Sequence, residues 1–117
     1  MKNDNAVVDK SKAFALKIIG IYRFLSDEKR EDIMSKQLLR CGTSIGANVR
    51  EAVRGQSKPD FYAKLNISLK EASETEYWLE LLHESGYLST QLFDGIHEDC
   101  VEIIKLLVAI TKTQHRE

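Results

Sequence analysis

The chain has 117 residues and a mass of 13.4 kDa, which limits it to one domain spanning residues 1–117. Its 17 basic and 18 acidic residues give a net charge of −1, and 43% of the residues are hydrophobic, a balance typical of soluble globular proteins. A single proline argues against a turn-rich β-sandwich, and no apolar run approaches the ~20 residues of a membrane span. Two cysteines without an export signal predict reduced thiols and a cytoplasmic location. The composition therefore excludes multidomain enzymes, membrane proteins and disulfide scaffolds.

Two segments with helical hydrophobic periodicity fill the first half of the chain. The first predicts an amphipathic helix over residues 5–25, with Ser11 at the one position of its stripe that is not apolar. The second predicts a helix over residues 29–54, followed by Gly55 at a position typical of a helix C-terminus. The two inward-facing stripes are Val7, Phe14, Ile18, Ile21 and Leu25, and Leu38, Cys41, Ile45, Val49 and Ala52.

A third helix is predicted over residues 58–85. Ser57 or Lys58 can cap its start, and Pro59 suits the first helical turn. Gly86 supplies a stop signal at its C-terminus. Its inward-facing stripe consists of Tyr62, Leu65, Leu69, Ala72, Leu79 and Leu82.

The fourth predicted helix, over residues 89–114, opens at Ser89 or Thr90 and is the most apolar of the four. Its first stripe consists of Leu92, Ile96, Cys100, Ile103, Leu107 and Ile110. A second stripe beside it consists of Phe93, Val101, Ile104 and Val108. Because one stripe per helix is enough for a single bundle core, the second indicates that another side of this helix is covered, for example by another subunit.

Short connections between long helices force consecutive helices to run antiparallel. We therefore expect an all-α fold, an up-down-up-down antiparallel four-helix bundle. Residues 1–56 carry a net charge of +4 and residues 57–117 a net charge of −5. This asymmetry suits a head-to-tail ring in which basic and acidic faces of adjacent copies meet. The alternative is a chance imbalance on solvated faces.

A G-x-S-x-G sequence runs from Gly42 through Ser44 to Gly46. In serine hydrolases this pattern needs a strand before a sharp turn, but the residues preceding Gly42 have helical periodicity. Each helix-interior glycine costs about 1 kcal/mol relative to alanine. We therefore interpret Gly42 and Gly46 as sites where another helix approaches closely.

Two short sequences resemble the Glu-x-x-His element of di-iron bundles, Glu80 with His83 and Asp94 with His97. Both lie close to helix ends, and the first two helices offer only acidic residues of a polar turn at that level. We interpret them as solvated or interfacial side chains and expect no metal and no cofactor.

Polar residues also lie beside the apolar stripes. Ser44, Asn48 and Glu51 follow at helical steps next to Ile45, and Glu76 interrupts the stripe of the third helix. A buried carboxylate needs a partner, for which Arg40, Arg50 or a tyrosine hydroxyl are candidates. We predict interhelical hydrogen bonds that fix alignment rather than acid–base catalysis.

Basic side chains of the first two helices are candidate contacts to nucleic-acid phosphates. The sequence has no helix-turn-helix or aromatic platform and its pI is 6.3, so this remains an alternative that oligomerisation would strengthen by gathering a basic rim. The candidate residues are Lys10, Lys12, Lys17, Arg23, Lys36, Arg40, Arg50 and Arg54.

Four stretches, residues 37–52, 56–61, 69–79 and 84–88, carry a resemblance to a known family. The most specific part is the Ser-Ile-x-x-Asn-x-x-Glu core at residues 44–51, followed by Asp60 and Phe61. The sequence resembles the four-helix bundle proteins encoded by intervening sequences in bacterial 23S rRNA genes, often labelled 23S ribosomal proteins. The likeness spans about residues 14–110.

The resemblance implies a bundle that assembles in similar proteins as a ring of five, and it brings no catalytic residues. Ser44, Asn48, Glu51, Asp60 and Phe61 are carried over only as bundle or interface positions. A related branch, the accessory proteins of diversity-generating retroelements, binds a reverse transcriptase and nucleic acid through a strongly basic surface, from which this chain departs in its near-zero net charge. We therefore expect a non-enzymatic, cytoplasmic homo-oligomer, a pentamer, with a protein or RNA partner. The alternative is a nucleic-acid-binding accessory factor that works with a reverse transcriptase or on rRNA.

Overall fold

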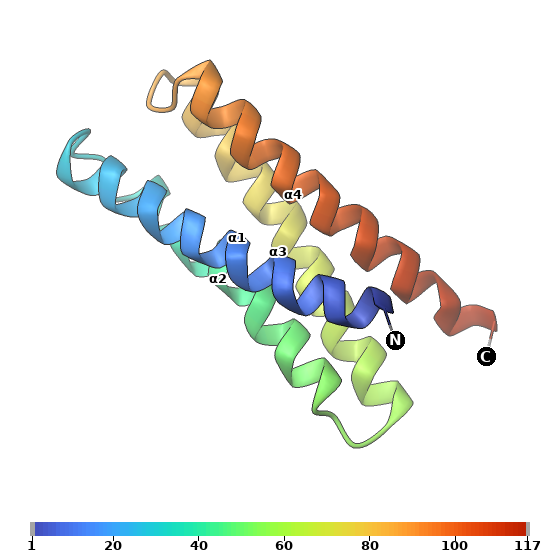
Figure 1. Cartoon of the computed structure of the whole chain (residues 1–117). Coiled ribbons are helices and arrows are strands. Elements are labelled where there is room, and N and C mark those ends of the chain that lie inside the picture. Colours follow the sequence, from blue (N-terminus) through green and yellow to red (C-terminus); the bar gives the residue numbers. More distant parts are fainter. Residues whose placement is uncertain (1, 117) are drawn as a thin grey trace.

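The four apolar stripes of the sequence meet along one axis in an all-α bundle (Figure 1). This computed structural model describes the backbone of residues 2–116 and the side chains of residues 5–114. A short 3₁₀ helix, η1, follows the last long helix, and the described part of the chain contains no strand. The elements are α1 (Lys2–Asp27), α2 (Met34–Val53), α3 (Lys58–Glu84), α4 (Thr90–Thr111) and η1 (Lys112–Arg116).

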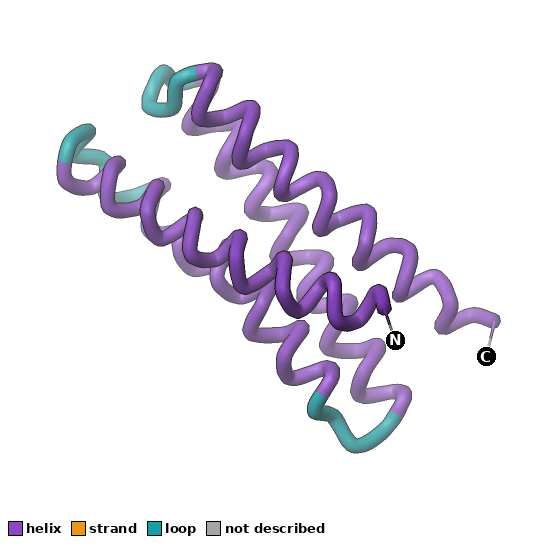
Figure 2. The backbone as a smooth tube through the Cα atoms, in the orientation of Figure 1, coloured by secondary structure: helices purple, strands orange, loops and turns teal. Residues whose placement is uncertain are grey.

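Consecutive helices run in opposite directions, as the short connections predicted. The α1–α2 and α3–α4 connections lie at one end of the bundle, and the α2–α3 connection lies at the other (Figure 2). Each helix packs against two neighbours, so that α1 contacts α2 and α4, and α3 contacts the same two helices from the opposite side. The expected up-down-up-down bundle is therefore the observed fold, with extents of 47 × 21 × 19 Å.

Most of the predicted stripe residues form the core. Ser11 is buried, and its hydroxyl donates to the carbonyl oxygen of Val8 at 3.2 Å. Ile21 and Leu69 are only half-buried. The prediction for Leu92 was wrong: its side chain is 45% exposed, because it lies in the first turn of α4 beside a groove that opens between α4 and α1.

Helix termini follow local signals with one exception. The Ser57 hydroxyl accepts from the backbone N–H of Asp60, and the Ser89 hydroxyl caps α4 in the same way. Gly86 has a φ of +90°, the left-handed conformation that ends α3. Helix α2 begins at Met34 rather than near residue 29, because the Glu31 carboxylate accepts from the backbone N–H groups of residues 33–35 at 2.8–3.1 Å and thereby caps the helix.

Candidate functional site

The G-x-S-x-G sequence lies inside α2, where it serves packing. A Cβ atom on Gly42 would come within 2.9 Å of Ile18 Cγ2, and one on Gly46 within 3.3 Å of the Ser11 carbonyl oxygen. The Ser44 hydroxyl donates to the Arg40 carbonyl oxygen at 2.7 Å. The predicted close approach of a second helix at these glycines is confirmed, and that helix is α1.

The polar residues beside the apolar stripe of α2 differ in whether they make the predicted contact between helices. Asn48 donates to the carbonyl oxygen of Ser44 at 2.9 Å, a bond within α2 rather than between helices. Glu51 makes a contact between helices, an ion pair with Lys64 on α3 at 3.2 Å. The buried link between α2 and α3 comes instead from Ser68, whose hydroxyl donates to the Ile45 carbonyl oxygen at 2.8 Å.

Glu76 makes a contact between helices as predicted, but its partner is none of the three candidates. It is half-buried and lies 2.9 Å from His97 Nε2 on α4. Arg40 instead pairs with Glu71 and Glu74 on α3. The indole N–H of Trp78, together with Arg40, holds the pKa of the Glu74 carboxyl below its usual value. The register of α2 and α4 against α3, which helical periodicity does not report, decides these pairings.

The two histidines of the metal hypothesis form part of an aromatic stack. The Phe93 ring lies between His83 and His97, with ring centroids 4.3 and 4.8 Å away and nearly parallel planes. His83 Nε2 lies 3.2 Å from the Thr90 hydroxyl. Within the described residues, no three His, Cys, Asp or Glu side chains come together as metal ligands.

Both cysteines are free and buried in the core. Burial raises the pKa of the Cys41 thiol, and raises that of Cys100 to about 12. The Cys100 thiol lies 3.5 Å from the Ala72 carbonyl oxygen. Because the thiolate is the nucleophilic form, neither cysteine is prepared for catalysis.

The structure divides the eight candidate basic residues into two groups. Lys10 pairs with Glu102, Lys17 with Asp99 at 2.6 Å, and Arg40 with α3 as above. Part of the charge expected to face a neighbouring copy is therefore neutralised within one chain. The remaining five form no ion pair with any residue from 5 to 114; they are Lys12, Arg23, Lys36, Arg50 and Arg54.

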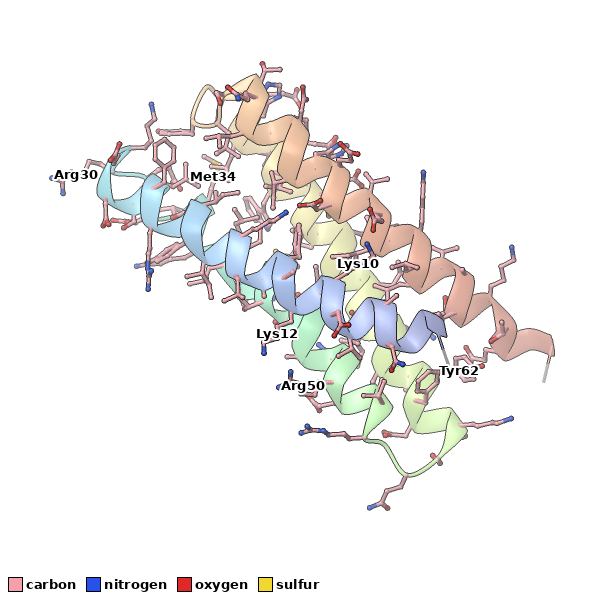
Figure 3. The ribbon with its side chains drawn as sticks, in the orientation of Figure 1. Lys10, Lys12, Arg30, Met34, Arg50 and Tyr62 are labelled. Carbon is pink, nitrogen blue, oxygen red and sulfur yellow. The ribbon has the colours of Figure 1, made fainter. Side chains whose placement is uncertain are left out.

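A groove runs along the outer seam of α1 and α2, and we call it the α1–α2 groove. Figure 3 shows Lys12 and Arg50 close to each other on this side, whereas Lys10 points toward α4. The residues that line this groove include Lys12, Ala15, Gly46, Ala47, Arg50 and Arg54. Three of the five unpaired cations therefore share one groove.

A second groove, the α1–α4 groove, opens on the other side of α1. A Cβ atom on Gly20 or Gly95 would meet no atom of the described residues within 4 Å. Leu92 is exposed at its edge, and a Lys17–Asp99 ion pair crosses it. Its apolar and glycine lining is Gly20, Ile21, Phe24, Leu92, Gly95 and Ile96.

The remaining predicted positions are structural. Ile45 is fully buried. Asp60 lies in the first turn of α3 against Gly55, where an added Cβ would meet its carboxylate. Phe61 is half-buried and packs edge-to-face on Tyr62, with ring centroids 5.1 Å apart.

Sequence reasoning missed Ser68, Gly20 and Gly95. Ser68 follows buried Leu65 by one helical step, so its inward position is visible in the spacing. Gly20 and Gly95 lie inside segments with helical periodicity, and no turn signal is nearby. An isolated glycine in such a segment destabilises the helix, so its position indicates a role in packing or binding.

None of the helices in the described part of the chain combines the length and apolar character that a bilayer crossing requires. No functionally curated protein matches the chain. A crystal structure of a protein of unknown function from the S23 ribosomal protein family of Bacteroides thetaiotaomicron VPI-5482 is 56% identical to it, with a TM-score of 0.93. The match covers 95% of this chain and 99% of that one.

The family model described as 23S rRNA-intervening sequence protein matches residues 3–109. That match and the structural likeness agree with each other over nearly the whole bundle. The chain belongs to the 23S rRNA-intervening sequence protein family.

Proposed function

We propose that this chain is a non-enzymatic, cytoplasmic protein that assembles with copies of itself and presents a composite surface to a protein or RNA partner. The free, buried thiols support a reducing compartment. The helical setting of Ser44 supports a role other than hydrolysis. A ring of five is the assembly that the family resemblance implies.

The observation that carries the proposal is the α1–α4 groove. Glycine inside a helix costs about 1 kcal/mol relative to alanine, and among the described residues nothing lies within 4 Å of where a Cβ atom on Gly20 or Gly95 would stand. The half-buried ring of Phe24 and the exposed side chain of Leu92 line the same groove. A second copy that inserts apolar side chains there would bury this surface and compensate the glycines.

Light scattering at low and high salt tests the proposal. We expect a species near five times 13.4 kDa whose mass falls when Gly20→Leu and Gly95→Leu fill the groove. Ala63→Leu, on the exposed face of α3, is the matched control and should leave the mass unchanged. A monomeric wild-type protein at both salt concentrations would refute self-assembly.

The candidate basic residues that form no ion pair with residues 5–114 favour a second candidate function. This function is that of a nucleic-acid-binding accessory factor that works with a reverse transcriptase or on rRNA. Five of the candidate cations, on α1, on α2 and at the C-cap of α2, form no ion pair with residues 5–114, whereas Lys10 and Lys17 pair with acidic residues of α4. Binding through phosphates weakens steeply with salt. A titration of RNA or DNA that showed no binding at low salt would remove this candidate.

A further inference from the structure

The α1–α2 groove gathers cations from α1 and from the C-terminal part of α2, and residues of α3 complete its lining. We infer that Lys12, Arg50 and Arg54 bind the phosphodiester backbone of a nucleic acid in this groove, independently of base sequence. The inference rests on the second candidate function and gives it a defined site.

Charge inside the groove favours a polyanion. Two acidic residues, Glu51 and Asp60, also line it, together with Lys64. Glu51 is engaged with Lys64 at 3.2 Å, and Asp60 lies against Gly55 in the first turn of α3. Lys12, Arg50 and Arg54 therefore keep their charge without an ion pair to any described side chain, and the groove retains a net positive charge.

The spacing of the cations suits a chain of phosphates. Arg50, in the last turn of α2, and Arg54, its C-cap residue, are four positions apart, which corresponds to a rise of about 6 Å along a helix. A spacing of this size is comparable to the distance between neighbouring phosphates along one strand, so the two guanidinium groups can contact adjacent phosphates. Lys12 reaches the same groove from α1, so the backbone would be held from both sides.

The floor of the groove indicates backbone contact rather than base recognition. It is made by small residues, Ala15, Gly46 and Ala47, and none of the groove residues is aromatic. Proteins that bind bases of single strands use aromatic side chains as stacking platforms. A phosphate fits between guanidinium and ammonium groups here, while nothing is offered to the base.

The basic face continues beyond the groove. Lys12 and Arg23 are separated by about three helical turns, and Lys36 and Arg54 by about five, so each pair lies on one side of its helix. Arg23 and Lys36 are exposed and have no ion pair with a described residue. A strand seated in the groove can therefore extend along the α1–α2 seam toward the α1–α2 connection.

Two triple variants with equal charge change test the site. The groove variant is Lys12→Gln/Arg50→Gln/Arg54→Gln, and the control, Lys10→Gln/Lys17→Gln/Arg40→Gln, removes the three cations that are already paired. Anisotropy titrations of a labelled single-stranded RNA and a labelled duplex DNA give affinity against salt, and light scattering gives the mass of each variant. We expect the groove variant to lose about tenfold or more in affinity and its salt slope for RNA to become shallower by about 2, since each contact to a single strand contributes roughly 0.7. The control should bind like the wild-type protein, and the two probes show which nucleic acid the site prefers.

Each other outcome overturns the inference in a recognisable way. Equal losses in both variants would show a general charge effect, leaving the candidate function without this site. A wild-type protein that binds neither probe at low salt would remove the function and the site together. A groove variant that loses its assembly, or RNA that is displaced by polyglutamate at equal charge, would assign the groove to a second copy or to an acidic protein.

Discussion

Helix α1 contacts its two neighbours in opposite ways. Toward α2 it meets Gly42 and Gly46, which leave no room for a Cβ and bring the two backbones together. Toward α4 it contributes Gly20, opposite Gly95, and both glycines face open space. The glycines of α2 allow close packing between α1 and α2, whereas Gly20 and Gly95 leave a groove between α1 and α4.

Glycine therefore has two different roles along α1. A glycine that permits close packing is needed by the single chain, and its replacement must disturb a core residue such as Ile18. A glycine beside a groove weakens its helix for no benefit within the chain. The first kind serves packing within the chain, and we propose that the second kind makes room for a second copy.

Gly42→Val should have the largest effect. The new side chain would collide with Ile18, a β-branched residue with little rotamer freedom, and overpacking of this kind costs about 1–3 kcal/mol. Urea unfolding measures the loss. The matched control is Gly20→Val, which meets nothing and should leave stability almost unchanged; similar losses in both variants would contradict the distinction between the two interfaces.

Small substitutions in the α1–α4 groove should raise the free energy of unfolding. Gly20→Ala together with Gly95→Ala should stabilise the chain by about 1–2 kcal/mol, because each replaces a helix-interior glycine without a clash. Unfolding is measured at protein concentrations low enough that the chain is dissociated. A loss of stability under these conditions would mean that the space beside the glycines is needed by the chain itself.

The ion pair across the open interface should matter least. Lys17 and Asp99 are 2.6 Å apart with 60% and 35% of their side chains exposed, and exposed pairs contribute about 0–1 kcal/mol. Lys17→Gln should therefore lower the unfolding free energy by no more than about 0.5 kcal/mol, and the difference should vanish in high salt. Lys12→Gln, which breaks no pair, controls for the loss of charge; a larger or salt-resistant effect at Lys17 would show that α4 depends on this contact.

Helical periodicity predicted the bundle because it reports which side of each helix is apolar. It also located the glycines of α2, whose spacing requires a close neighbour. It did not find the partner of Glu76 or of Arg40, since a contact between helices depends on their relative register. The start of α2 was missed for a related reason, because Glu31 caps the helix from within a loop whose path the sequence pattern does not describe.

The two grooves could not be predicted from the sequence, because ion pairing depends on which helix packs against each face. Lys10 and Lys12 differ by two positions and look equivalent in a list of basic residues. They point to opposite sides of α1, and only the packing of α4 decides that Lys10 is neutralised while Lys12 is not. Site prediction therefore needed the neighbours of each face as well as the face itself.

The separation of charge across the bundle has an electrical consequence. Residues 1–56, which include α1 and α2, carry a net charge of +4, and residues 57–117, which include α3 and α4, carry −5. A chain with a net charge of −1 therefore carries a dipole transverse to its long axis. In the field of a polyanion such a dipole experiences a torque even though the net force on the whole molecule is weakly repulsive. The molecule would turn before it docks, and orientation rather than attraction would set the rate of productive encounters.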